Sequence, residues 1–220
     1  MNDPMQEVKD RLILAVLPEI PFSGWTMATL ADAAGALGMD RSMAERAFPG
    51  GPVEAALHFA DLADRRLESE AAEVDLGTMG MTARIKWLVR RRIDAWTEHR
   101  EAVRRAVGMF SLPTLGGKAS RAAWRTADLI WRLAGDESVD FSYYSKRLSL
   151  AGVYSATLLL WLSDTSADNE ESWSFLDRRA AELARLPKLI NQWKDRVQAL
   201  AAPRRQRGGR QFGVNRVRRT

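Results

Sequence analysis

The chain has no cysteine and only two histidines among its 220 residues. Without cysteine it has no disulfide framework and no thiolate nucleophile or metal ligand. Its longest apolar stretch, residues 148–162, is interrupted by serine and threonine and is too short to cross a bilayer. The first ten residues, MNDPMQEVKD, lack the basic and apolar regions of a signal peptide. We therefore expect a soluble intracellular protein.

The sequence also lacks the spaced motifs of common catalytic sites. His58 and His99 stand alone, and the neighbouring Glu98 points to a different side of a helix than His99 does. There is no Glu-x-x-His pair, no glycine-rich phosphate loop and no serine nucleophile with a base at motif spacing. We expect no enzyme, no catalytic residue, no cofactor and no bound metal. The charged runs at 64–66 and 90–92 are interpreted as solvated helix faces.

The net charge of +5 is concentrated at one end of the chain. Residues 203–220 contain seven arginines and no acid, so the rest of the chain carries a net charge of −2. We expect this Gly/Arg-rich tail to be disordered. The positive charge therefore does not indicate a basic DNA-docking face on the folded part.

Apolar residues recur at helical spacing almost throughout, which predicts an all-α protein. Thr26 is expected to cap the helix that begins at Met27, and residues 22–25 form a turn in which Phe22 and Trp25 are aromatic anchors. Residues 112–117 are expected to be a loop. The other expected helices cover residues 6–17, 41–48, 52–73, a segment from 82 past Trp96, 119–134, 141–162, 170–186 and 188–201.

The segment MATLADAAGALGMDRSMAERAFPGG, residues 27–51, has the spacing of a helix-turn-helix. It resembles the TetR repressor family at Thr29-Leu30, Ala34 and Phe48-Pro49, with Gly38 at the turn. In such motifs the second helix enters the DNA major groove.

The departures from that family fall on positions that face DNA. Glu45 stands where the family has a phosphate-binding tyrosine, Gly51 stands where it has a lysine, and Asp40 adds a further negative charge. Because phosphate contacts supply most non-specific DNA affinity, these changes remove the attraction. We expect the segment to be a packing unit, and nucleic acid is not an expected partner.

The second half of the chain resembles the ubiquinone (coenzyme Q) biosynthesis auxiliary family, the Coq-nine proteins. The likeness extends over residues 8–200 and is strongest from 131 to 164. It is carried by motifs in the same order as in the family: Trp131 before Ala134-Gly135-Asp136, then Asp140-Phe141, Tyr143-Tyr144 and Arg147, then Tyr154, a DTSAD loop, and Trp173, Phe175 and Leu176. Gly24-Trp25, Phe48-Pro49-Gly50-Gly51 and Leu112-Pro113 also match.

The resemblance implies a TetR-like fold that binds lipid instead of DNA. Family members are not enzymes. They hold isoprenoid lipids, including quinone intermediates, in an apolar cavity and touch the membrane with a C-terminal amphipathic helix. They present the intermediate to a ring hydroxylase, which in eukaryotes is a di-iron demethoxyubiquinone hydroxylase, and they commonly form homodimers. By this likeness a partner-binding patch is expected at Leu133, Tyr143, Tyr144 and Arg147.

Two further features agree with these roles, although each has an ordinary structural alternative. Residues 188–200 predict a short helix with cations on its polar side, which suits either a membrane surface or packing on the domain. Its expected membrane-contact residues are Leu189, Ile190, Trp193, Val197 and Leu200. A lipid cavity and a plain core use the same residue types; the candidates for lipid contact are Trp87, Leu88, Ile130, Trp131, Tyr154, Leu158, Leu159 and Leu162. Helix 141–162 is apolar on most of its circumference, so we expect it to be surrounded.

We therefore expect a helix-turn-helix remnant at 1–65, a larger lipid-binding helical bundle at 66–187, a membrane-contacting helix at 188–202 and the tail at 203–220. The expected function is that of a lipid-binding auxiliary protein of ubiquinone biosynthesis, cytoplasmic and peripheral to the inner membrane, or in the mitochondrial matrix of a eukaryote. The alternative is a TetR-type, ligand-responsive transcriptional repressor.

Overall fold

The computed structural model describes residues 4–138 and 141–183, and every regular element in these ranges is helical. The prediction of an all-α chain is therefore confirmed. The helices are α1 (Pro4–Val16), α2 (Ile20–Ser23), α3 (Met27–Ala36), α4 (Met43–Ala47), α5 (Gly51–Ala72), α6 (Met81–Asp94), α7 (Arg100–Phe110), α8 (Gly116–Leu133), α9 (Phe141–Ser163) and α10 (Glu170–Leu183). Short 3₁₀ turns lie at Leu76–Thr78, Thr97–His99 and Ala167–Asn169.

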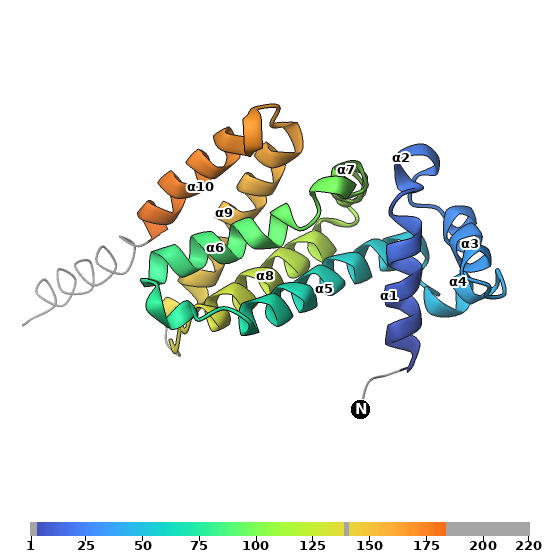
Figure 1. The fold of residues 1–220 in the computed structure, drawn as a ribbon, viewed down its shortest axis with the longest axis horizontal. Coiled ribbons are helices and arrows are strands. Elements are labelled where there is room, and N and C mark those ends of the chain that lie inside the picture. The colour runs from blue at the N-terminus through green and yellow to red at the C-terminus, as the bar shows by residue number, and fades with distance from the viewer. Residues whose placement is uncertain (1–3, 139–140, 184–220) are drawn as a thin grey trace, which may run out of the picture. The chain divides into compact units, whose positions relative to one another are not determined.

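The first four helices form a small layer at one end of α5 (Figure 1). Helix α1 packs against α3, α4 and α5, and its Leu12 and Ile13 are fully buried together with Leu30 of α3. Thr26 accepts a hydrogen bond from the Thr29 amide, so the predicted N-cap is confirmed. The expected helix-turn-helix segment is thus two short helices that rest on α1.

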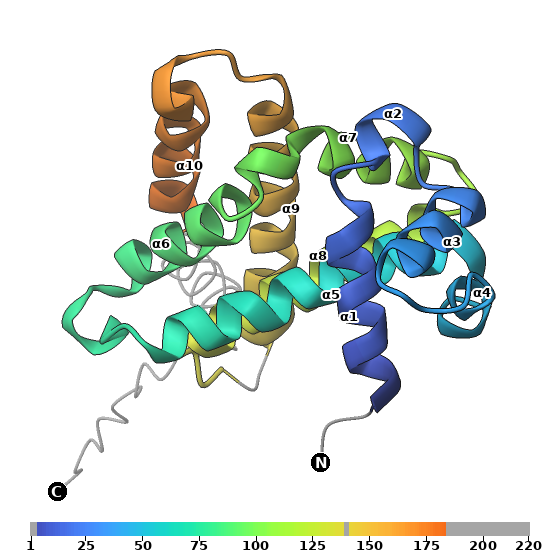
Figure 2. The same ribbon diagram turned by 45° about the vertical axis from the view of Figure 1, so that its right-hand side comes forward.

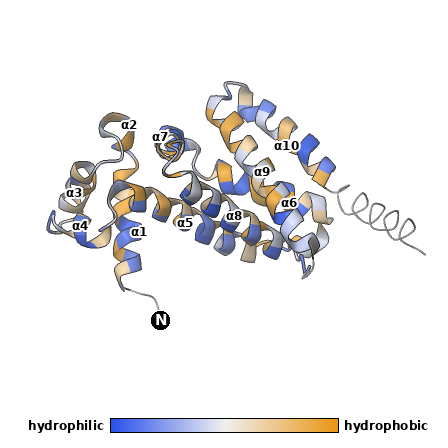
Figure 3. Cartoon of the chain, turned by 180° about the vertical axis from the view of Figure 1, so that it is seen from behind, coloured by the Kyte–Doolittle hydropathy of each residue, from blue (hydrophilic) through white to orange (hydrophobic). Residues whose placement is uncertain are grey.

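The larger bundle consists of α5 to α10. Helix α9 packs against α8 and α10, α5 packs against α6 and α8, and α10 also meets α6 (Figure 2). Each helix carries both hydrophobic and hydrophilic residues along its length, as an amphipathic bundle requires (Figure 3). Helix α5 continues through residue 65, so it belongs both to the N-terminal layer and to the bundle.

Two local expectations are wrong. The helix that begins near residue 82 ends at Asp94, and a separate α7 follows a 3₁₀ turn. The break contains neither glycine nor proline; it places Trp96 in the interior, where its ring lies perpendicular to that of Phe59 at 4.7 Å between centroids. Of the two expected aromatic anchors, only Trp25 is buried and bonded, to the Ala102 carbonyl at 3.1 Å, whereas Phe22 is 83% exposed.

Helix α9 is not fully surrounded in the described part of the chain. Leu150 and Trp161 are completely buried, but Leu148 and Leu159 are 68% and 56% exposed. The protein core of the described residues therefore does not enclose α9 by itself, and one apolar side of the helix faces outward; the alternative expectation, that core and ligand together surround it, stays a prediction. The predicted helix at 188–200 and the tail lie outside the described residues. No helix in the described ranges has both the length and the apolar character needed to cross a membrane.

Candidate functional site

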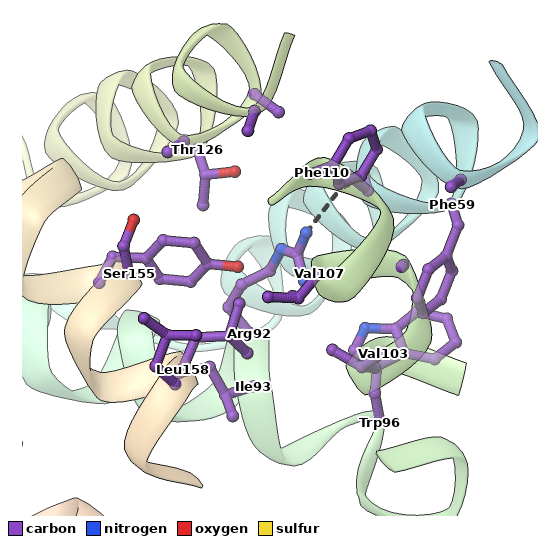
Figure 4. Close-up of a pocket in the computed structure, with 18 of the residues that line it drawn as sticks. Phe59, Arg92, Ile93, Trp96, Val103, Val107, Phe110, Thr126, Ser155 and Leu158 are labelled. Atoms are coloured by element: carbon purple, nitrogen blue, oxygen red, sulfur yellow. Dashed lines mark hydrogen bonds between the residues drawn. The ribbon is translucent and has the colours of Figure 1, made fainter. Parts of the chain in front are cut away.

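A cavity of about 300 Å³ lies among α5, α6, α7, α8 and α9 (Figure 4). This volume is at the lower end of the range that small-molecule sites occupy. The side chains around it are mainly aliphatic and aromatic. They are Ala56, Phe59, Ala60, Arg92, Ile93, Trp96, Val103, Ala106, Val107, Phe110, Ser111, Ala119, Ala122, Ala123, Thr126, Tyr154, Ser155, Leu158, Leu159 and Trp161.

The sequence of α7 explains one wall of the cavity. Val103, Val107 and Phe110 recur at intervals of four and three residues and therefore share a helix face, and all three line the cavity. On α8, Ala119 and Ala123 are small, which leaves open space between α7 and α9. The hollow is a consequence of small side chains opposite large ones.

The lining includes both exposed and buried residues. Leu159 and Ser111 line it and are exposed, whereas Arg92, Thr126 and Tyr154 line it and are buried. The buried residues therefore form the inner part, and Leu159 and Ser111 lie at the rim.

Arg92 is the one charged residue among those that line the cavity. Its Nε donates to Asp64 Oδ1 at 2.8 Å and its Nη2 donates to the Ala60 carbonyl at 2.9 Å. From α8, Arg125 Nε donates to Asp64 Oδ2 at 3.0 Å and the Thr126 hydroxyl donates to Asp64 Oδ1 at 2.9 Å. Arg92, Arg125 and Thr126 thus all donate to the Asp64 carboxylate, and of these three Arg92 and Thr126 line the cavity.

The interpretation of residues 64–66 and 90–92 as solvated faces is therefore wrong for Asp64 and Arg92, which are 4% and 7% exposed. Burial alone would lower the pKa of Arg92, but Tyr154 and Asp64 together raise its pKa above the ordinary value. Arg92 therefore remains charged in the interior.

Tyr154 lies in the same part of the cavity. Burial raises the pKa of Tyr154 above its ordinary value, although Arg92 acts in the opposite direction. The phenol is therefore protonated at neutral pH. Among the described residues, no hydrogen bond joins its hydroxyl to a protein group.

The structure brings three of the eight candidate lipid-contact residues to the cavity. Tyr154, Leu158 and Leu159 line it. The other five candidates are absent from the lining: Trp87 and Leu88 on α6, Ile130 and Trp131 on α8, and Leu162 on α9. Leu88 and Ile130 are fully buried in the core of the bundle.

Sequence reasoning missed the α7 wall and Arg92. The apolar stripe of Val103, Val107 and Phe110 is visible in the sequence, but its direction depends on the break between α6 and α7, which the sequence does not predict. Arg92 could not be separated from Arg90 and Arg91 by residue type. Its position on the inward face of α6, beside the buried Val89 and Ile93, is the signal that distinguishes it.

A second polar cluster joins the end of α8 to the start of α9. Arg147 donates from Nε to Asp128 Oδ1 at 2.5 Å and from Nη1 to Asp136 Oδ2 at 3.2 Å, and its guanidinium carbon lies 3.4 Å from the Tyr143 ring centroid. Lys146 Nζ also donates to Asp136, at 2.6 Å. Together these bonds lower the pKa of both aspartates below the ordinary value, against the opposite effect of burial.

This cluster changes the interpretation of the predicted partner patch. Arg147 is only 2% exposed, so its expected place on a surface is wrong: both of its carboxylate partners hold it inside. Tyr144 is 63% exposed, Tyr143 is half-buried with its ring against that of Tyr144, and Leu133 at the end of α8 is half-buried. Only the Tyr144 side of the patch is open to a partner.

The DTSAD loop is organised by its first residue. The buried carboxylate of Asp164 accepts from the amide and hydroxyl of Ser166 and of Ser172, at distances of 2.5 to 2.9 Å. Burial alone would raise the pKa of Asp164, but these four bonds hold its pKa well below the usual range. The loop is therefore a connection that fixes the start of α10.

The region of α3 and α4 carries two exposed arginines, and of these Arg46 has no ion pair within the described ranges. Arg41 pairs with Asp32, and Glu45 is exposed on α4. A hydrogen bond from Ser42 holds the pKa of Asp40 below its usual value, so this exposed carboxylate is also charged. In the described ranges no three acidic or histidine side chains are close enough to hold a metal, and His58 is bonded to Asp10 at 2.6 Å.

The chain is similar to known proteins over most of its length. The COQ9 family model matches residues 117–187, which include the Arg147 cluster and the Asp164 loop. The ubiquinone biosynthesis protein COQ9 of Xenopus tropicalis is 31% identical over 194 residues, which are 85% of this chain and 61% of that protein. The COQ9 protein of Homo sapiens is 30% identical over 202 residues, which are 89% of this chain and 63% of that protein.

The chain thus spans about three fifths of the length of these curated relatives, which are named as mitochondrial. Among solved structures, a TetR transcriptional regulator from Nitrosomonas europaea is similar with a TM-score of 0.66 and 19% identity, over 81% of this chain and 98% of that one. The predicted TetR-like fold is therefore confirmed. Over most of its length, the chain is therefore similar to proteins of the COQ9 family.

Proposed function

We propose that this chain is a non-enzymatic auxiliary protein of ubiquinone biosynthesis that holds an isoprenoid quinone intermediate in the cavity between α5 and α9. The relatives are named ubiquinone biosynthesis proteins. The observation that carries the proposal is the mainly apolar lining, with a rim at Leu159. An apolar cavity with a few convergent polar groups is the usual form of a site for a largely hydrocarbon ligand.

The size of the cavity limits what it holds. About 300 Å³ cannot enclose a whole long polyisoprenoid chain, so part of such a chain extends beyond the rim. We propose that the expected amphipathic helix at 188–200 then rests on a membrane surface, where Trp193 and its apolar neighbours insert and the arginines that follow meet anionic lipid. The protein would then be peripheral to the inner membrane, or lie in the mitochondrial matrix of a eukaryote.

We further propose that the exposed side of Tyr144, with Tyr143 beside it and Leu133 at the end of α8, meets the ring hydroxylase that receives the intermediate. Exposed aromatic residues commonly anchor protein interfaces. The proposed homodimer is supported by Leu148, which is 68% exposed on an apolar side of α9 that a second copy would cover.

The alternative of a ligand-responsive repressor shares the fold but not the surface. Helix α4 is five residues long and carries Glu45 where phosphate would lie, and Arg41 is engaged by Asp32. A negative side chain against the DNA backbone opposes binding. These contacts support the lipid-binding proposal over DNA recognition.

Mass spectrometry of an organic extract of the purified protein tests the proposal. The expected result is an isoprenoid lipid with a quinone or phenol ring, bound at close to one molecule per chain and enriched over the lipid composition of the host cells. Extracts that contain only phospholipid in the proportions of the host membrane would contradict it.

A further inference from the structure

Polar and aromatic residues occupy different sides of the cavity. In Figure 4, Thr126 and Ser155 lie on one side of Arg92, and Phe59, Trp96 and Phe110 lie on the other. Thr126 and Arg92 are buried, as is Tyr154 next to Ser155 on α9. The polar side is therefore shielded from bulk water, where hydrogen bonds to a ligand are stronger than at an open surface.

Two hydrogen-bond donors on this side are not used within the described residues. Arg92 donates from Nε and Nη2, while its Nη1 has no protein acceptor there. The Tyr154 hydroxyl likewise has no bonded partner in the described ranges, and it lies close enough to Arg92 for each group to shift the pKa of the other. Both residues line the cavity, and neither atom is among the fully buried, unbonded side-chain atoms of the described ranges, so each keeps some accessible surface.

Trp161 has a polar atom without a partner. It lines the cavity and is fully buried, and its Nε1 has no hydrogen-bond partner among the described residues. The cation of Arg100 lies over its ring, 4.5 Å from the centroid. Because protein atoms close off this nitrogen, it reduces stability and does not reach a ligand, so the unused donors that keep accessible surface are those of Arg92 and Tyr154.

The charges around the polar side balance one another. Asp64 is paired with Arg92 and Arg125, Asp61 with Arg125 and Arg65, and the Asp10 carboxylate with Arg65. Within this network three carboxylates thus face three guanidinium groups, whereas Arg66 and Arg100, which lie over the rings of Trp96 and Trp161, stand outside it. The network leaves Arg92, the one charged lining residue, no surplus positive charge for a buried phosphate or carboxylate, which favours an uncharged ligand that accepts hydrogen bonds.

We propose that Arg92 and Tyr154 form a head-group site inside the cavity that selects an uncharged, oxygen-bearing ring, such as a quinone or phenol, over hydrocarbon and over anionic heads. This inference rests on the proposed function and specifies which part of the lipid lies where. The ring oxygen accepts from Arg92 Nη1 and from the Tyr154 hydroxyl. The isoprenoid tail lies along Phe59, Trp96 and Phe110 and leaves past Leu159.

The test compares three ligands with the full chain: a ubiquinone with two isoprene units, the two-isoprene hydrocarbon myrcene, and geranyl diphosphate. Binding constants are measured by calorimetry, and quinone binding is also followed by quenching of tryptophan fluorescence, since Trp96 and Trp161 line the cavity. The variants are Tyr154→Phe, which removes one hydroxyl, and Arg92→Lys. Ser163→Ala, which removes an exposed hydroxyl at the end of α9 outside the cavity lining, is the matched control. Circular dichroism and the thermal midpoint establish that each variant is folded.

The wild type is expected to bind the quinone at least ten times more tightly than either other ligand. Tyr154→Phe should weaken quinone binding about threefold to tenfold, which is the effect of one hydrogen bond, and should leave myrcene binding within about twofold. If a misfolded Arg92→Lys yields no binding constant, Tyr154→Phe decides the matter alone.

Four results would overturn the inference. If the wild type binds myrcene as well as the quinone, or if Tyr154→Phe retains the full preference, the head-group site is wrong while lipid binding stands. If geranyl diphosphate binds most tightly, the site takes an anion. If no ligand binds the wild type, the proposed function fails together with this inference.

Discussion

Arg147 and Asp128 are joined at 2.5 Å between Nε and Oδ1, across the junction of α8 and α9, and the same guanidinium reaches Asp136 at 3.2 Å. The residues that carry the family likeness in this region thus have a structural role. They fix the angle between the two helices that supply Thr126, Tyr154 and Leu158 to the cavity. Asp128, Asp136 and Arg147 therefore support two helices that line the cavity, although none of the three residues lines it.

Replacing Arg147 with methionine should strongly destabilise the protein. The change leaves Asp136, which is 4% exposed on its side chain, with Lys146 as its remaining cation, and we expect a loss of about 3 kcal/mol in the free energy of unfolding. Arg132→Met is the matched control, because Arg132 also pairs with Asp128 but is 57% exposed; it should cost less than about 1 kcal/mol. Urea denaturation measures both, and equal losses would show that the buried cluster has no special role.

Asp164 gives a prediction about pH. The pKa of this carboxyl is lowered in the folded state, so its contribution to stability is present above the unfolded pKa, near 4, and is lost as the pH falls through the folded value. Asp164→Asn should therefore be about 2 kcal/mol less stable than the wild type at pH 7. The difference should shrink below pH 4. Chemical denaturation at a series of pH values measures it, and a difference that stays constant down to pH 3 would contradict the assignment.

How much the sequence predicts differs between parts of this protein. The positions of most helices and the Thr26 cap follow from local periodicity and residue type. The division between α6 and α7 does not, because the break is stabilised by the packing of Trp96 on Phe59 and by no local breaker residue. Tyr154, Leu158 and Leu159 were predictable because they lie on the most apolar helix.

The polar part of the site was the hardest to predict. Asp64 and Arg92 belong to runs of charged residues that look like solvated faces, and only tertiary contacts show that one member of each run turns inward. For Arg147 the error has the opposite direction. Beside Tyr143 and Tyr144 it has the composition of an interaction surface, yet it is buried, because it pairs with Asp128 of α8 and with Asp136 of the following turn.

The surface of α3 and α4 leads us to expect no specific DNA binding. An electrophoretic mobility experiment with random double-stranded DNA should show only the weak, salt-sensitive association that the arginines of residues 203–220 produce. Deletion of those residues should abolish the shift. A shift that survives the deletion and depends steeply on salt would instead support the repressor alternative.

Residues 188–200 lead to a prediction about membranes. On liposomes that contain anionic lipid, the full chain should float, and Trp193→Glu should reduce the floating fraction at least fivefold, because it places a charge on the apolar side of the expected helix. Gln192→Glu introduces the same charge on the polar side and should have a much smaller effect. Equal reductions by the two variants would mean that net charge alone governs binding and that no helix face inserts.

The central claim is that the cavity holds the lipid, and filling the cavity tests this claim most directly. Ala123→Phe places a ring into the lined space from α8, whereas Ala83→Phe, on an exposed position of α6 outside the lining, is the matched control. The measurement is the molar ratio of short-chain ubiquinone to folded protein after gel filtration. The account predicts a ratio near one for the wild type and the control, and at least a fivefold reduction for Ala123→Phe with the thermal midpoint retained; an undiminished ratio in folded Ala123→Phe would contradict it.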